Sequence, residues 1–285
     1  MLSHLLIASL LLFQSQQGGA SRGGNGGGAL PPPPAFHEPT PFERFVDKLD
    51  LDSKTQLPDV EKIFTTASAE TTPIGRELIQ LRLRMFELDS KPGEMAPVLA
   101  AYTTSATKMT AVEARTFQQV YALLNAKQQT KSADAFLLMA GLLDPPLPRA
   151  GRGDRRGGGG GGTENMTRME FLTALFTLDG SEKKQVKSIM DAESKAAASL
   201  RDQWTTSRGV VGLAIQNGKG PADLDQAVSA HAAHAVAMAA LEMKVLARIV
   251  AVLTPEQQAK IPAIQASVFL MRGAFTGKKW DTTPE

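Results

Sequence analysis

Apolar side chains recur at intervals of three, four and seven residues along two long stretches of each half of the chain, which is the spacing of one face of an α-helix. The clearest stripe consists of Leu224, Val228, His231, Ala235, Met238, Val245 and Ile249. A second helical stretch, from Asp179 to about Gln216, precedes it, and the sequence NGKGP at 217–221 separates the two. The break DSKPG at 89–93 divides the first half in the same way. The pattern predicts an all-α fold in which each half is a hairpin of two long helices with short helices at its margins.

The order of the apolar positions is the same in both halves, which indicates an internal duplication. In the first long stretch the positions recur 126 residues later, so that Val60, Ile63 and Ile74 correspond to Val186, Ile189 and Leu200. In the second stretch the interval is 129 residues, which relates Met95, Leu99, Phe117 and Val120 to Leu224, Val228, Leu246 and Ile249. Because neither hairpin buries its apolar stripe alone, we expect the two halves to pair within one chain as a pseudo-dimer, or the chain to form a homo-oligomer.

Glycine- and proline-rich segments delimit the two halves. The apolar run at 5–13 is too short for a membrane span, which needs about 20 residues, and the small residues at 18–20 follow it as a cleavage site. We therefore expect export to the periplasm, and no second segment is long and apolar enough to be transmembrane. The predicted organisation is a signal peptide at 1–20, a flexible Gly/Pro-rich leader at 21–40, a first helical unit at 41–144, a flexible Gly/Arg/Pro-rich linker at 145–162, a second helical unit at 163–276 and a tail at 277–285.

The composition removes several other classes of function. The 31 Lys and Arg residues nearly balance the 29 Asp and Glu residues, and a net charge of +2 does not favour nucleic acid as a partner. The absence of cysteine excludes a disulfide scaffold, a thiolate nucleophile and any zinc site that needs Cys. No glycine-rich loop follows a strand pattern, and no histidine stands beside a plausible catalytic partner, so we expect neither an enzyme nor a bound cofactor.

One local pattern, a leucine followed by a helix N-cap residue, occurs four times. The four segments are Leu51-Asp52-Ser53-Lys54-Thr55, Leu124-Asn125-Ala126-Lys127-Gln128, Leu178-Asp179-Gly180-Ser181-Glu182 and Leu253-Thr254-Pro255-Glu256-Gln257. The last three place Gln128, Glu182 or Gln257 at the third helical position, which completes a capping box with the N-cap residue. The motifs therefore predict helix starts at Asp52, Asn125, Asp179 and Thr254. They contain no nucleophile, base or ligand set.

The segment LTPEQ, from Leu253 to Gln257, is an intact LTXXQ motif and resembles the signature of the Spy/CpxP family of bacterial periplasmic proteins. In that family two such motifs bracket a long helical hairpin, at the spacing seen here between Leu178 and Leu253. Asp179 and Glu182 replace Thr and Gln in one motif of the second half, and neither motif of the first half is intact. The resemblance implies a thin all-helical cradle, usually a homodimer, that shields unfolded or envelope proteins without ATP or acts in envelope-stress and metal sensing. Two units in one chain depart from the usual single-unit form.

Two groups of residues are candidates for binding. Arg82, Met85, Arg201 and Arg208 combine charge with apolar surface on the first long helix of each half, and we expect them to project toward a client protein. His231 and His234 lie three residues apart, a spacing that suits zinc or copper. A metal-free alternative is that both are part of an apolar stripe, since Tyr102 occupies the position equivalent to His231. The alternatives to a chaperone or stress adaptor are therefore a periplasmic metal-binding sensor or buffer and a structural helical envelope protein.

Overall fold

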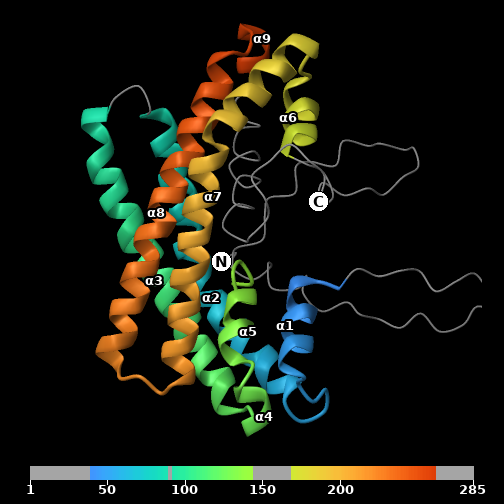
Figure 1. Cartoon of the computed structure of the whole chain (residues 1–285), viewed down its shortest axis with the longest axis vertical. Helices are drawn as coiled ribbons and strands as arrows, with labels where there is room; N and C mark the ends of the chain where they lie inside the picture. Colours follow the sequence, from blue (N-terminus) through green and yellow to red (C-terminus); the bar gives the residue numbers. More distant parts are fainter. Residues whose placement is uncertain (1–38, 89–91, 144–167, 261–285) are drawn as a thin grey trace, which may run out of the picture. The chain divides into compact units, whose positions relative to one another are not determined.

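The computed structural model describes residues 39–88, 92–143 and 168–260, and all regular secondary structure in these residues is α-helical (Figure 1). This confirms the all-α prediction. The helices are α1 (Pro41–Leu49), α2 (Leu57–Glu87), α3 (Pro92–Ala122), α4 (Ala126–Gln129), α5 (Ser132–Leu138), α6 (Arg168–Phe176), α7 (Gly180–Gln216), α8 (Pro221–Ala251) and α9 (Pro255–Gln258). The predicted signal peptide, most of the leader, the linker at 145–162 and the tail at 277–285 lie outside the described residues.

The long helices of the second half begin and end where the sequence pattern places them. α7 begins at Gly180, directly after its cap Asp179, and ends at Gln216. Gly218 then takes up a left-handed backbone conformation with φ of 62°, which residues with a side chain rarely adopt. α8 begins with Pro221 in its first turn, where the missing N–H would have no helical partner in any case.

The predicted helix start at Asp52 is wrong. Residues 53–56 form a turn and α2 begins at Leu57. The Asp52 carboxylate accepts hydrogen bonds from the backbone N–H groups of Lys54 and Thr55, at 3.0 and 2.7 Å, and from the Thr55 hydroxyl at 2.7 Å. The hydroxyl bond is the largest cause of a lowered pKa at Asp52. The Asp52 backbone N–H donates to the side-chain amide oxygen of Gln56, four residues later, whereas in a capping box the acceptor lies three residues after the cap. This motif therefore carries one extra residue, and the helix starts later.

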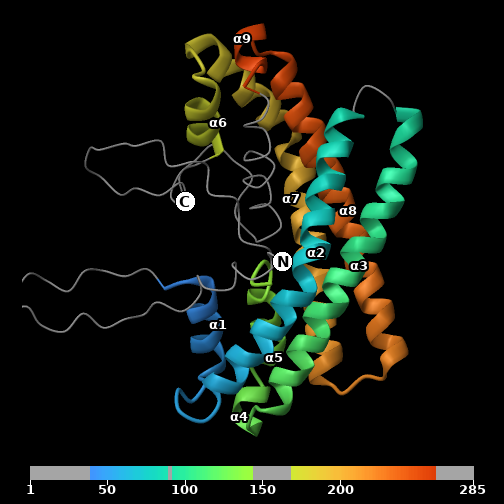
Figure 2. The same ribbon diagram turned by 180° about the vertical axis from the view of Figure 1, so that it is seen from behind.

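The two long helices of each half lie side by side, α2 against α3 and α7 against α8 (Figures 1 and 2). The two halves contact each other chiefly through α8, which packs against both α3 and α2, and through α5, which packs against α7. The contacts between the halves thus join helices that do not follow one another in the sequence.

Two apolar clusters form the core, and each combines residues from both halves. In one cluster Leu253, from a motif of the second half, belongs with Met85, near the C-terminal end of α2. In the other, Leu124, from a motif of the first half, belongs with Ile215 and Leu224, which flank the break between α7 and α8. The end of each half that carries its two motifs therefore packs near the end of the other half where the two long helices are connected. The two halves thus lie antiparallel and bury their apolar stripes against each other.

The crossing of α5 over α7 gives a prediction about stability. A Cβ atom on Gly212 would lie 2.9 Å from the backbone oxygen of Ala133 and 3.2 Å from Cβ of Phe136. A Cβ on Gly209, one turn earlier in α7, would meet nothing within 4 Å. We expect Gly212→Ala to lower the free energy of unfolding by about 1–3 kcal/mol through overpacking. Gly209→Ala should raise it by up to ~1 kcal/mol through helix propensity. Urea denaturation measures both values, and similar changes at the two sites would contradict this packing.

Candidate functional site

The sequence-predicted caps of the remaining three motifs are present. The backbone N–H of the third helical residue donates to the cap side chain in each: Gln128 to Asn125 at 3.0 Å, Glu182 to Asp179 at 2.8 Å and Gln257 to Thr254 at 3.3 Å. The side chain at the third position accepts in return from the cap backbone N–H. Leu253 is buried in the core. These residues start helices, as the sequence predicts.

The motifs also bind to each other, which the sequence did not reveal. In the first half the side-chain amides of Gln56 and Gln128 form two reciprocal hydrogen bonds of 2.9 Å. In the second half the side chain of Gln257 donates to Glu182 at 2.9 Å. The partners in these pairs are 72 and 75 residues apart in the sequence. The two motifs of each half therefore join the ends of its helices, and their role is structural.

The residues expected to project toward a client are mostly in the interior. Arg82 and Met85 are 1% exposed and Arg208 is 2% exposed, so the expectation that these three side chains are presented at the surface is wrong. Arg201 alone of the four is partly exposed. The physical reason is that each buried arginine has a buried glutamate as its partner, which offsets the cost of removing the charge from water.

Two buried ion pairs connect the halves reciprocally. Arg82 on α2 of the first half pairs with Glu242 on α8 of the second half. Arg208 on α7 of the second half pairs with Glu113 on α3 of the first half, with 2.7 Å between Nη1 and Oε2. Arg82 and Arg208 are 126 residues apart and Glu113 and Glu242 are 129 apart, the intervals of the internal repeat. The same contact is thus made twice, in opposite directions, as across the interface of a two-fold dimer.

Each guanidinium is also fixed by further contacts. Burial lowers the pKa of Arg82, but the attraction of Glu242 and Tyr102 raises it more, and the pKa lies above its ordinary value. Arg208 donates through Nε to the backbone oxygen of Phe136 at 3.3 Å. It also lies 4.5 Å from the ring centre of Phe136 and 5.6 Å from that of Trp204, within reach of cation–π attraction. Both guanidinium groups are therefore held in place by contacts beyond their glutamate partners.

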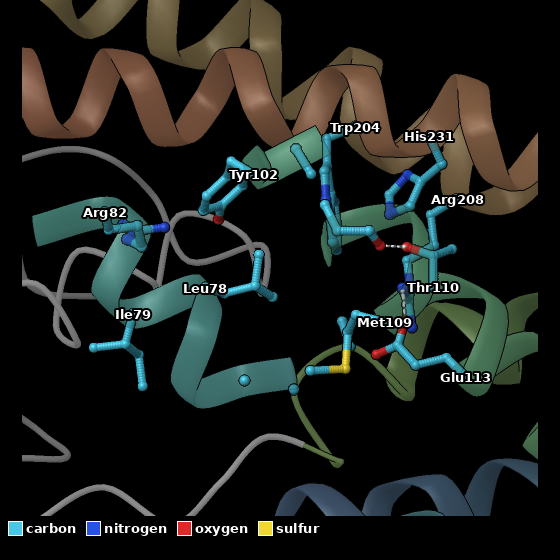
Figure 3. A pocket seen from close by; sticks show the side chains of 15 residues that line it. Leu78, Ile79, Arg82, Tyr102, Met109, Thr110, Glu113, Trp204, Arg208 and His231 are labelled. Atoms are coloured by element: carbon cyan, nitrogen blue, oxygen red, sulfur yellow. Dashed lines mark hydrogen bonds and ion pairs between the residues drawn. The ribbon is translucent and has the colours of Figure 1, made fainter. Parts of the chain in front are cut away.

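A cavity of about 100 Å³ lies where the two halves meet, between the two ion pairs (Figure 3). Its lining includes four pairs of residues that are equivalent in the repeat: Leu78 and Trp204, Arg82 and Arg208, Tyr102 and His231, and Ala106 and Ala235. Ala106 and Ala235 have small side chains, so they leave a volume that larger side chains would fill. The cavity is therefore a product of the pairing between the halves.

His231 is buried beside this cavity. Its Nδ1 lies 2.9 Å from the Ser207 hydroxyl, and its ring is 5.1 Å from that of Trp204. Burial, then the charge of Arg208 and then His234 lower the pKa of His231 to about 3. His234 is partly buried on the same helix. The described residues contain no group of three or more histidine and carboxylate side chains that could hold a metal ion. The geometry places His231 in the apolar stripe of α8.

One exposed face of α7 lacks charge. Gln203, Thr206, Val210, Leu213 and Asn217 follow one another at intervals of three or four residues, and all five are exposed. We call these five residues the α7 stripe. Val210 and Leu213 are each 49% exposed, and Leu138 on α5, at 37%, is the other exposed large apolar side chain in the described part of the chain.

The equivalent positions of the first half are charged. At an interval of 126 residues, Val210 and Leu213 correspond to Arg84 and Glu87, which form an exposed ion pair of 3.2 Å on α2. The two halves therefore share their buried contacts but differ in this surface. The signal in the sequence that distinguishes the two surfaces is the replacement of the charged pair Arg84 and Glu87 by Val210 and Leu213 at equivalent positions of the repeat.

Comparison with models of known families, with curated proteins and with solved structures finds no match to this chain. None of the helices in the described ranges combines the length and apolar character required to cross a membrane.

Proposed function

We propose that this protein is an ATP-independent chaperone or envelope-stress adaptor, exported to the periplasm, that holds unfolded or envelope proteins. The observation that carries the proposal is the reciprocal pair of buried ion pairs, Arg82–Glu242 and Arg208–Glu113. A Spy/CpxP-like cradle is usually built from two identical subunits. In this protein the two halves of one chain make the contacts that two subunits would make.

The α7 stripe is the surface that we propose for client contact. Unfolded chains expose apolar side chains, and Val210 and Leu213 offer apolar area without a neighbouring charge in the stripe that would have to be desolvated. Arg201, which is partly exposed on the same helix, adds a positive charge that speeds the encounter with acidic segments. A small apolar area gives weak and unselective binding, which suits a protein that must release its clients without ATP.

The chain itself supplies the variant that tests this surface. Val210→Arg with Leu213→Glu gives α7 the charged pair that α2 carries at Arg84 and Glu87. Because all four positions are exposed, we expect the free energy of unfolding to change by less than about 0.5 kcal/mol. The loss of two half-exposed apolar side chains should weaken binding of a reduced, carboxymethylated client by about thirtyfold, from roughly 1 kcal/mol for each side chain. Fluorescence anisotropy of the labelled client measures this affinity.

The reverse exchange is the matched control. Arg84→Val with Glu87→Leu places the apolar pair on α2, and we expect it to retain or strengthen client binding. Unchanged affinity in the Val210→Arg/Leu213→Glu variant would show that the α7 stripe is not the binding surface. An unmodified chain that binds no unfolded client would overturn the proposed function.

A further inference from the structure

One polar atom in the cavity between the halves is buried without a hydrogen-bond partner among the described residues: Nη2 of Arg208. Nε of the same guanidinium donates to Phe136 and Nη1 to Glu113, and the side chain is 2% exposed. A buried guanidinium N–H that makes no hydrogen bond is costly, so such an atom marks a place for an acceptor. Arg208 lines the cavity, and its other two nitrogens are occupied.

The donor and the cavity limit the chemistry and the size of that acceptor. Arg82 pairs with Glu242, and Arg208 pairs through Nη1 with Glu113, so the donor left for a ligand is Nη2 of Arg208. A guanidinium N–H forms its strongest hydrogen bonds with a carboxylate. Leu78, Met109 and Trp204 supply apolar surface in the same cavity. An enclosed volume of about 150 Å³ holds benzene and a water occupies about 30 Å³, so a cavity of about 100 Å³ admits a molecule of only a few heavy atoms. Leu78, Ile79 and Ala235 are only partly buried, which leaves the cavity accessible from outside.

We infer that this cavity is a binding site for a short-chain carboxylate of about two to four carbons. The carboxylate accepts a charge-assisted hydrogen bond from Nη2 of Arg208, and the alkyl chain lies against Trp204, Leu78 and Met109. Because residues of both halves line the site, an occupied cavity stabilises the paired arrangement of the halves. The site is separate from the α7 stripe, and its occupancy is a property beyond client binding.

Propionate is the probe for this site. The chain has two tryptophans, so the Trp280→Phe variant leaves Trp204, in the cavity wall, as the sole indole. Sodium propionate, balanced against sodium chloride at constant ionic strength, is titrated while the emission of Trp204 is recorded. We expect a saturable change with a millimolar Kd and a rise in the melting temperature. Propionamide, which lacks the negative charge, should bind at least about tenfold more weakly. Octanoate, which exceeds the volume, should give no saturable change.

Two variants locate the binding. Ala235→Leu fills the cavity and leaves both ion pairs in place, and it should abolish the saturable response to propionate. Glu113→Met with Arg208→Met removes the donor together with its charge partner and should also abolish the response. Equal affinity for propionate and propionamide, or a propionate response that persists in Ala235→Leu, would overturn the inference. Since Ala235→Leu alters neither charge, it keeps the test decisive if the double methionine variant does not fold.

Discussion

Replacing Glu113 by glutamine lowers the free energy of unfolding by about 3 kcal/mol, although the two side chains are nearly the same size. The reason is that Arg208 stays buried and charged when its carboxylate partner, 2.7 Å away, is lost. Urea denaturation followed by circular dichroism gives this value. The reciprocal arrangement of the halves predicts a loss of similar size for Glu242→Gln, which removes the partner of Arg82.

Two control variants separate the effect of an unpaired buried charge on stability from the effect of an ordinary substitution. Arg115→Gln breaks an exposed ion pair with Glu70 and should cost less than about 0.5 kcal/mol. Glu113→Met with Arg208→Met removes both buried charges and should recover stability to within ~1 kcal/mol of the unmodified protein. A loss at Glu113→Gln no larger than that at Arg115→Gln would show that the ion pair between the halves is not buried in solution.

Acid weakens the protein through His231. This histidine is neutral in the folded protein, with a pKa near 3 caused by burial, Arg208 and His234, whereas an unfolded histidine titrates near 6.5. The unfolded state therefore binds one more proton between these values. The free energy of unfolding therefore suffers no loss from His231 above pH 6.5, and it falls as the pH drops from 6.5 toward 3. We expect a loss of roughly 2–3 kcal/mol from this residue at pH 4.5.

The variant His231→Tyr isolates this contribution, since Tyr102 occupies the equivalent position of the first half. Free energies of unfolding at pH 7.5 and pH 4.5 should differ less in His231→Tyr than in the unmodified protein, by the amount given above. His234→Gln, on the same helix, serves as the control and should keep the acid loss. The same pH dependence in His231→Tyr and the unmodified protein would contradict a buried neutral His231.

Interactions within a few residues were predictable from the sequence. The caps at Asn125, Asp179 and Thr254 and the limits of α7 follow from hydrogen bonds that span three or four residues. The error at Asp52 has the same local origin, because one extra residue before Gln56 shifts the reciprocal hydrogen bond and delays the helix. The hydrogen bonds between motifs could not be found in this way, since they connect helix ends 72 and 75 residues apart.

Arg82 and Arg208 were wrongly predicted to be exposed because an arginine in a helical sequence does not by itself show whether its side chain faces the core or the solvent. The glutamate partners of Arg82 and Arg208 are 160 and 95 residues away. Two signals were nevertheless present. The apolar stripe of α8 has a gap between Met238 and Val245, and Glu242 fills it. Both members of each ion pair also recur at the intervals of the repeat. A charge that occupies an apolar position in both copies indicates a contact between the copies.

We propose that one chain, through its two paired halves, holds an unfolded protein as a dimeric cradle would. The most direct measurement is the stoichiometry of the complex with a reduced, carboxymethylated client, determined by analytical ultracentrifugation without ATP. Light scattering with an aggregating client accompanies it. We predict one chain for each client and suppressed aggregation at an equimolar ratio. Client that sediments free of the chain and aggregates at the same rate in its presence would contradict the account.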